Sequence, residues 1–196
     1  MKNIVLSILL MSACAMIYAQ ADSSPYQAIV AVDGSGDYKT VQEAINAVPD
    51  GQTKPWLILI KNGLYNEQVI IPKNKPYVHL IGQDKDKTII HLNLNVGSKL
   101  TGKEIGGKTA YWEHSVHNPS SPVYKYEGSV VVVKGDHFYT ENISYVNDWG
   151  VLSDNGPQAL AMNSQADCAS FYNCKFRSFQ DTWMTANNDV LSLIHI

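Results

Sequence analysis

The chain has 196 residues, of which 45% are hydrophobic, and its formal net charge at pH 7 is −3. This length and apolar content are enough to bury a sizeable core, and the length is typical of one domain. The charge is slightly negative and the sequence has no basic clusters, so we expect no nucleic-acid partner.

The N-terminus has the pattern of a secretory signal. Lys2 precedes an apolar run over Ile4–Ile17, and a small-residue cleavage position follows. We therefore predict a signal peptide over residues 1–19 and a polar leader over residues 20–27, with secretion or export to the periplasm. The run is too short for a stable membrane span. Lipoprotein processing at Cys14 is the alternative.

A short helix follows the leader. Thr40 to Glu43 has the sequence of a capping box, in which the Thr side chain accepts from a free backbone N–H and the Glu side chain reaches back. Pro49 to Gly51 marks the end of this helix. Its apolar residues share one face, which we expect to be buried: Val41, Ala44, Ile45 and Val48.

After this helix, the sequence consists of short β-rich runs separated by Gly, Asn, Asp and Pro turns. No second long helix separates the runs, so alternating β-α units are not expected. Many short strands without helices indicate a sandwich, a barrel or a solenoid. The runs are Trp56–Ile60, Gln68–Ile71, Val78–Ile81, Thr88–Leu92, Val130–Val133, Phe138–Val146, Ala159–Met162 and Ala169–Phe176.

A weak internal repeat favours the solenoid. Phe138–Tyr145 resembles Phe171–Phe176 with a two-residue deletion, and repeated aromatic and Asn positions are typical of stacked coils. Asn142 begins a glycosylation sequon, which we interpret as a ladder position. The segment Gly97–Glu127 interrupts the pattern, and we expect a surface excursion there that shapes a binding cleft.

Two cysteines, Cys168 and Cys174, lie beyond the signal. A disulfide is one alternative in an oxidising compartment, and two small core side chains are the other, which we favour. Two cysteines without a nearby histidine make a poor zinc site. We expect neither a metal nor a cofactor.

The Gln180-Asp181 pair places an amide beside a carboxylate, and a second amide, Gln158, lies about one solenoid turn upstream. Amide N–H groups can hold an oxyanion and a carboxylate can move protons, which suits hydrolysis of a carboxylic ester without a serine. Stacked coils lie about 4.8 Å apart, so the two amides would project from neighbouring rungs of one sheet. Alternatively, Gln158 joins an internal hydrogen-bond ladder, and Asp181 caps a turn or pairs with Arg177.

The chain resembles the pectin methylesterase family from about Ile29 to Trp183. The motifs that carry the resemblance are Asp33–Tyr38 with Thr40–Ile45, Gly63–Pro72, Leu80–Gly82 with Thr88–Ile90, Asn142–Asn147, and Gln158–Ala161 with Asp167, Phe171, Cys174 and Gln180–Thr182. The resemblance implies an all-β fold, a right-handed parallel β-helix over residues 28–190 with a short N-terminal capping helix. It also implies pectin, a methyl-esterified homogalacturonan, as substrate.

The resemblance also implies roles for the motif residues. Gln158 and Gln180 match the glutamines that stabilise the oxyanion, and Asp181 matches the aspartate that acts as general acid and then as general base. The family's nucleophilic aspartate attacks the methyl ester, and water then hydrolyses the acyl-enzyme. Stacking places this nucleophile one coil after Asp181, beyond Ile196, and Asp189 comes too early. We therefore expect a β-helix that is incomplete at its C-terminus and a chain that is itself inactive.

Two tryptophans are candidate substrate contacts. Trp149 and Trp183 either stack on sugar rings or belong to the core. We expect the protein to be a monomer.

The last six residues do not continue the family pattern. Leu191–Ile196 is the translation of CTG TCT CTT ATA CAC ATC, which resembles a common transposon-end sequencing adapter. Our hypothesis is that residues 191–196 are an artefact without biological meaning. The alternative is an ordinary apolar strand.

Other functions remain as alternatives. A pectate lyase would need a calcium-binding carboxylate cluster and a basic residue, and a polygalacturonase would need a set of aspartates. Neither cluster stands out in the sequence. A non-catalytic sugar-binding β-helix is the second alternative. The sequence has no Gly-x-Ser-x-Gly or His-Glu-x-x-His motif, which disfavours serine and zinc hydrolases.

Overall fold

The computed structural model describes residues 24–93, 129–149, 159–185 and the strand at 193–195, which form three parallel sheets and one helix, α2 (Val41–Ala47). Sheet A contains β1 (Ala28–Val30), β2 (Trp56–Ile60), β5 (Val78–Gly82), β8 (Tyr139–Glu141), β11 (Ser170–Tyr172) and β14 (Leu193–His195). Sheet B contains β3 (Gly63–Asn66), β6 (Thr88–Leu92), β9 (Ser144–Asn147) and β12 (Lys175–Arg177). Sheet C contains β4 (Val69–Ile71), β7 (Val131–Val133), β10 (Met162–Ser164) and β13 (Trp183–Thr185).

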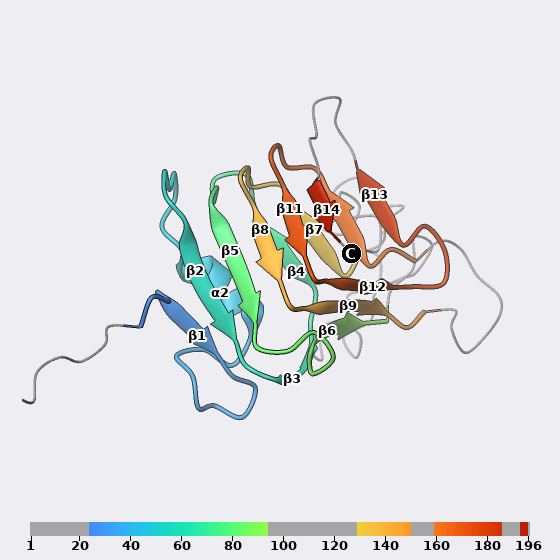
Figure 1. The fold of residues 1–196 in the computed structure, drawn as a ribbon, viewed down its shortest axis with the longest axis horizontal. Coiled ribbons are helices and arrows are strands. Elements are labelled where there is room, and N and C mark those ends of the chain that lie inside the picture. The colour runs from blue at the N-terminus through green and yellow to red at the C-terminus, as the bar shows by residue number, and fades with distance from the viewer. Residues whose placement is uncertain (1–23, 94–128, 150–158, 186–192, 196) are drawn as a thin grey trace, which may run out of the picture.

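The chain passes through sheets A, B and C in turn, and equivalent strands of successive coils pair in parallel (Figure 1). Ser144 of β9 pairs with Lys175 of β12, which gives 31 residues (175 − 144) between equivalent positions. Met162 of β10 pairs with Trp183 of β13, which gives only 21 residues (183 − 162). The second interval is smaller because the connection from sheet B to sheet C is shorter between β12 and β13 than between β9 and β10. This architecture is the predicted parallel β-helix.

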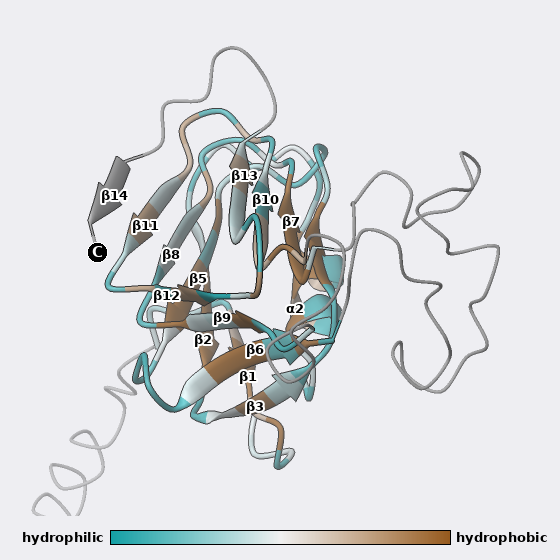
Figure 2. Ribbon diagram, turned by 90° about the vertical axis from the view of Figure 1, so that its right-hand side faces the viewer, coloured by the Kyte–Doolittle hydropathy of each residue, from teal (hydrophilic) through white to brown (hydrophobic). Residues whose placement is uncertain are grey.

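Side chains that point inward at the same register position form ladders along the core. Tyr65, Ile90, Tyr145 and Phe176 occupy one such position in sheet B. The first three are buried, and the rings of Tyr145 and Phe176 stack with centroids 5.4 Å apart. Figure 2 shows apolar residues concentrated along β6 and β7. Burying one such side chain contributes about 1.5–3 kcal/mol, so these ladders hold the coils together.

The predicted helix and its capping box are confirmed in α2. The Glu43 N–H donates to Thr40 Oγ1 over 3.2 Å, and the Thr40 N–H donates to Glu43 Oε2 over 3.2 Å. The helix contacts β1 and β4, which are edge strands of sheets A and C. It therefore covers the first coil of the solenoid. Its apolar face is buried as predicted, with Val41, Ala44, Ile45 and Val48 all at most 1% exposed.

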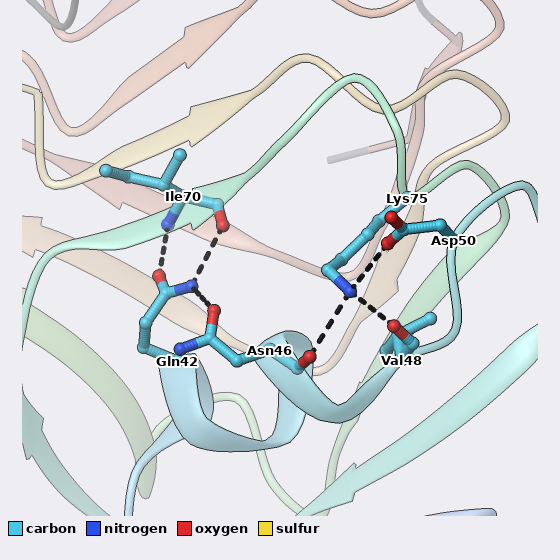
Figure 3. Close-up of polar contacts among 6 residues, drawn as sticks. All are labelled: Gln42, Asn46, Val48, Asp50, Ile70 and Lys75. Carbon is cyan, nitrogen blue, oxygen red and sulfur yellow. Dashed lines mark hydrogen bonds and ion pairs between the residues drawn. The ribbon is translucent and has the colours of Figure 1, made fainter.

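The N-terminal turn of α2 is tied to the first coil by polar side chains. The Glu67 carboxylate accepts the N–H groups of Val41 and Gln42 over 2.8 and 2.9 Å. The Gln42 side chain in turn bonds both the N–H and the C=O of Ile70 in β4 (Figure 3). Burial raises the pKa of Glu67 above its ordinary value, although the two N–H groups act in the opposite direction.

The other end of α2 is held by a buried lysine. The Lys75 ammonium donates to the carbonyl oxygens of Asn46 and Val48 and pairs with Asp50 over 3.1 Å (Figure 3). Carbonyl groups at a helix C-terminus lack intrahelical donors and favour a positive charge. Lys75 therefore has partners for a charge that would otherwise be costly to bury.

Several strands match the sequence prediction closely. β2 and β6 have the predicted bounds, and β4, β5 and β7 each differ from the prediction by one residue. Two predicted runs each contain two strands, because a residue in the left-handed region turns the chain from sheet A to sheet B. Asn142, with φ 56°, separates β8 from β9, and Asn173, with φ 46°, separates β11 from β12.

Other strand predictions are wrong. The strand expected over Ala159–Met162 lies instead over Met162–Ser164, because pairing with Val131–Val133 sets its position. The short strands β1, β3 and β13 were not predicted as separate elements. They are short and are formed through pairing with neighbouring coils.

The ladder position predicted for Asn142 is confirmed. The Asn173 amide donates to Asn142 Oδ1 over 2.7 Å, and Lys85 Nζ donates to Asn173 Oδ1 over 2.9 Å. The internal repeat therefore exists, but the predicted two-residue deletion is wrong. Phe171 pairs with Thr140 rather than with Phe138, so the offset of 31 residues holds across both strands.

The two cysteines have different environments. Both are free thiols, with Cys174 buried and Cys168 exposed. The Cys174 thiol lies near the Thr140 carbonyl, at 3.7 Å. The expectation of two core side chains is therefore right for Cys174 and wrong for Cys168, which occupies a left-handed turn position with φ 56°.

Some predicted features cannot be placed. The signal peptide at 1–19 and the excursion at Gly97–Glu127 lie outside the described residues. Among the helices that the structure does describe, none has the length and apolar character of a membrane span.

The C-terminal residues Leu193–His195 form β14, which pairs in parallel with β11 of sheet A. This is the strand alternative left open by the sequence. The adapter hypothesis concerns the origin of residues 191–196 and stays a hypothesis.

Candidate active site

The predicted Gln180-Asp181 pair lies in the turn that connects β12 of sheet B to β13 of sheet C. This turn stacks on the segment before β10. The Ala159 N–H donates to the Gln180 carbonyl over 3.1 Å, and the N–H groups of Ala161 and Met162 donate to the Thr182 carbonyl, each over 3.1 Å. The carbonyl groups on both sides of Asp181 are thus fixed by the preceding coil.

Asp181 has an unusual backbone conformation, with φ 53°. A non-glycine residue in this region is strained, although Asp tolerates it better than most, and such strain gathers at functional sites. The side chain is exposed, and within the described part of the chain its carboxylate has no hydrogen-bond or ion-pair partner. The alternative of an ion pair between Asp181 and Arg177 is not observed. The fixed turn therefore holds an exposed carboxylate that has no partner among the described residues.

The two glutamines can be placed only in part. Gln180 is exposed, and Gln158 lies outside the described residues. Its neighbour Ala159 forms an isolated antiparallel bridge with Gln180. The chain next to Gln158 therefore lies on the coil adjacent to Gln180. This geometry agrees with the expectation of neighbouring rungs, but the convergence of the two side chains stays a prediction.

The two tryptophans differ in their surroundings. Trp149 is half-buried, and in the described chain its Nε1 is a buried donor without a hydrogen-bond partner. The Trp183 ring packs edge-on against Phe171 and Phe176, with centroids 4.4 and 4.6 Å away. These contacts favour the core interpretation for Trp183. For Trp149, the indole N–H is instead an unpaired donor among the described residues.

The structure also reveals polar residues that the sequence analysis did not single out. Asn147, at the end of β9, is fully buried and donates from Nδ2 to the Leu160 carbonyl over 2.9 Å. Next to it, Asp148 pairs with His91 Nε2 of the preceding coil. An Asn at the end of a predicted strand is the only sequence signal, because both interactions join residues distant in sequence.

A carboxylate and an amide exposed on a rigid turn can serve acid–base and oxyanion roles in acyl transfer. The family model for pectinesterases matches residues 27–189. The chain belongs to the pectinesterase family.

Individual relatives agree with this family assignment. The chain is 38% identical over 154 residues to a probable pectinesterase/pectinesterase inhibitor from Arabidopsis thaliana, a match that covers 79% of the chain and 23% of the relative. The chain thus spans about a quarter of the length of that curated relative.

Solved structures show the same fold. The pectin methylesterase from carrot superposes with a TM-score of 0.63 at 30% identity, over 81% of this chain and 42% of the carrot protein. A pectin methylesterase in complex with a hexasaccharide superposes with a TM-score of 0.62 at 25% identity, over 83% of this chain and 46% of that protein. The parallel β-helix is therefore the family architecture.

Proposed function

We propose that this chain carries the proton-transfer and oxyanion part of a pectin methylesterase site, in a protein that removes methyl groups from pectin and releases methanol. The observation that carries the proposal is the rigid Gln180-Asp181 turn, whose carboxylate is exposed and unpartnered among the described residues. The family match over residues 27–189 supports pectin as the substrate class.

The proposed reaction assigns each group one task. A nucleophilic aspartate attacks the ester carbonyl, and the amide N–H groups of Gln158 and Gln180 stabilise the negative charge on its oxygen. Asp181 donates a proton to the departing methoxy group, so methanol leaves and an acyl-enzyme anhydride forms. Asp181 then accepts a proton from water, which attacks the anhydride. The products are galacturonic acid, which releases its proton to solvent as galacturonate, and the free carboxylate of the nucleophile, and Asp181 is again protonated.

The observed coil length gives a position for the nucleophile. Equivalent residues of β10 and β13 are 21 positions apart, as Met162 and Trp183 show. One further coil of this length places a residue above Asp181 at position 202 (181 + 21), which is not among the 196 residues. We therefore propose that the 196 residues alone do not release methanol and that a longer product of the same gene does.

Trp149 is the proposed sugar contact. Its indole N–H has no hydrogen-bond partner in the described chain, and it follows β9 at the same B-to-C edge as Gln180. An indole offers an apolar face and one donor, which suits a sugar ring and its hydroxyl groups. A related pectin methylesterase has been solved with a hexasaccharide. For Trp183 we keep a substrate contact only as the less supported alternative.

Methanol release from highly esterified pectin tests this function. We expect release by the longer gene product and none by the 196-residue chain. Asp181→Asn in the longer product should lower kcat by about 10²–10⁴-fold, because the amide cannot donate and accept the proton in turn. Full activity of that variant, or unsaturated or depolymerised products in place of methanol, would contradict the proposal.

We also propose that the protein is exported through the signal at residues 1–19. N-terminal sequencing of the protein recovered outside the cytoplasm should begin at Gln20. A start at Cys14 would indicate the lipoprotein alternative instead.

A further inference from the structure

The side chain of Asn147 joins two segments of chain beside the candidate active site. Asn147 is the last residue of β9 and is 0% exposed. Its Oδ1 accepts the Trp149 N–H over 3.1 Å, and its Nδ2 donates to the Leu160 carbonyl over 2.9 Å. One buried amide therefore holds both the chain that leaves sheet B and the chain that approaches sheet C.

The residues on both sides of Leu160 hydrogen-bond to the turn that carries the candidate catalytic pair. On one side of this residue, the Ala159 N–H donates to the Gln180 carbonyl, and on the other, the Ala161 N–H donates to the Thr182 carbonyl, each over 3.1 Å. These carbonyl groups belong to the two residues that flank Asp181. The hydrogen bond from Asn147 thus fixes the middle of the segment on which the Asp181 turn rests.

Regular sheet pairing does not fix this segment. β10 begins only at Met162, and Ala159 takes part in a single isolated bridge with Gln180. Before β10, the chain is held by individual hydrogen bonds, one of which is from the Val131 N–H to the Ala161 carbonyl over 3.1 Å. The Leu160 carbonyl has two of them, from Asn147 Nδ2 and from the Val130 N–H at 3.1 Å. Asn147 supplies the shorter of the two.

We propose that Asn147 is a positioning residue for Gln180 and Asp181. It acts through the Ala159–Ala161 backbone. It thereby sets the position and orientation, relative to the preceding coil, of the turn that carries the two side chains. The inference rests on the proposed function, because the reaction gives the exact placement of the turn its importance. A displacement of about 1 Å in a catalytic group can lower a rate by about 10²-fold.

The first test uses Asn147→Asp in the longer gene product. The substitution keeps the size of the side chain and the acceptor for Trp149, but it replaces the donor to Leu160 with an oxygen. We expect kcat for methanol release to fall by on the order of 10²-fold, while KM for pectin changes less than about twofold. An unchanged kcat, while the unsubstituted protein is active, overturns the proposal.

The matched control is Asn173→Asp. It also removes an amide donor from a short hydrogen bond, the 2.7 Å bond to Asn142 Oδ1, but at the turn from sheet A to sheet B. We expect this variant to lose stability and to keep the parent kcat at temperatures where it is folded. An equal loss of kcat in both variants would show a general structural effect and would overturn the positioning role.

The second test needs no activity and uses the 196-residue chain. Hydrogen exchange at the amides of Ala159 and Ala161 should quicken by on the order of tenfold in Asn147→Asp and remain unchanged in Asn173→Asp. The same exchange in Asn147→Asp as in the parent chain overturns the proposal. If the longer product releases no methanol at all, the proposed function fails, and exchange alone decides whether Asn147 holds this segment.

Discussion

The turns from sheet A to sheet B and the turn from sheet B to sheet C contain the same unusual backbone conformation. Asn142 and Asn173 have φ 56° and 46° in the first, and Asp181 has φ 53° in the second. The two asparagine side chains hydrogen-bond each other between coils. The Asp181 carboxylate has no such partner in the described chain. In the described chain, the two left-handed asparagines thus link neighbouring coils through their side chains, whereas the left-handed Asp181 leaves its carboxylate exposed and unpaired.

The two turns also offset the backbone strain differently. A left-handed residue other than glycine costs roughly 1–2 kcal/mol, and Asn and Asp tolerate the conformation best. In the A-to-B turns, the strain is offset by the side-chain hydrogen bonds that join Lys85, Asn173 and Asn142. In the B-to-C turn, it is offset by the backbone hydrogen bonds that the carbonyl groups of Gln180 and Thr182 accept. The second arrangement leaves the acidic side chain without a partner in the part of the chain that the structure describes.

After Asp181→Asn, the largest expected effect is on the amide beside Asp181. Gln180→Ala and Gln180→Glu in the longer product should each lower kcat by about 10²–10³-fold, or about 2.7–4 kcal/mol, because both remove an oxyanion donor. Since Gln180 is exposed, the free energy of unfolding should change by less than about 0.5 kcal/mol. Initial rates of methanol release and urea unfolding measure both. A fully active Gln180→Glu variant would contradict the oxyanion role of Gln180 and thus the difference in function between the two kinds of turn.

The next effect concerns packing at the A-to-B turn. A Cβ added at Gly82 would lie 2.1 Å from the Asn142 carbonyl oxygen, so Gly82→Ala should destabilise the fold by about 3 kcal/mol. Gly51→Ala is the control, because nothing lies within 4 Å of its added Cβ and only its positive φ is strained. We expect about 1 kcal/mol there. Urea unfolding of both variants measures the losses. Equal losses of unfolding free energy in the two variants would refute the tight contact between Gly82 and Asn142.

A smaller loss is expected from the asparagine ladder itself. Asn173→Gly removes the bonds to Asn142 and Lys85 but keeps the left-handed turn, and it should cost about 1–2 kcal/mol of unfolding free energy. Asn173→Ala should cost about 1 kcal/mol more, since alanine is strained at this φ. Denaturant midpoints separate the two contributions: the loss in Asn173→Gly measures the hydrogen-bonded ladder, and the further loss in Asn173→Ala measures the backbone strain. Identical midpoints would mean that strain is negligible.

The smallest effect is the pH dependence due to Glu67. Its pKa is raised in the folded state above the ordinary 4.5, chiefly by burial. Its contribution to stability is therefore fully present below pH 4.5 and is lost as the pH rises through the folded pKa. Urea unfolding between pH 4 and about pH 7 should show this loss in the parent chain and a flatter profile in Glu67→Gln. Matching profiles would contradict the assignment to Glu67.

The sequence predicted elements whose signal is local. The capping box at Thr40 and Glu43 specifies the start of α2 by itself, and the apolar runs of β2 and β6 lie between clear turn residues. β10 was misplaced because Ala159–Ala161 is as apolar as a strand. Pairing with β7 decides where the strand begins, and no local pattern contains that information.

The candidate site was predictable to the extent that its residues are adjacent in sequence. Gln180 and Asp181 form a recognisable pair, so the motif alone suggested their chemistry. The contribution of Asn147 was not predictable, because its partner Leu160 lies 13 residues (160 − 147) away, across the connection from sheet B to sheet C, whose length varies between coils. The core packing of Trp183 likewise depends on Phe171 and Phe176 of the same coil, which only the folded chain brings against it.

The most direct test of the central claim compares the two kinds of turn in one assay. Asp181→Asn and Asn173→Gly should be made in the longer gene product, and both methanol release and unfolding free energy should be measured. The account predicts that Asp181→Asn loses about 10²–10⁴-fold in kcat with little change in stability, and that Asn173→Gly does the reverse. An active Asp181→Asn protein that has lost stability would contradict it.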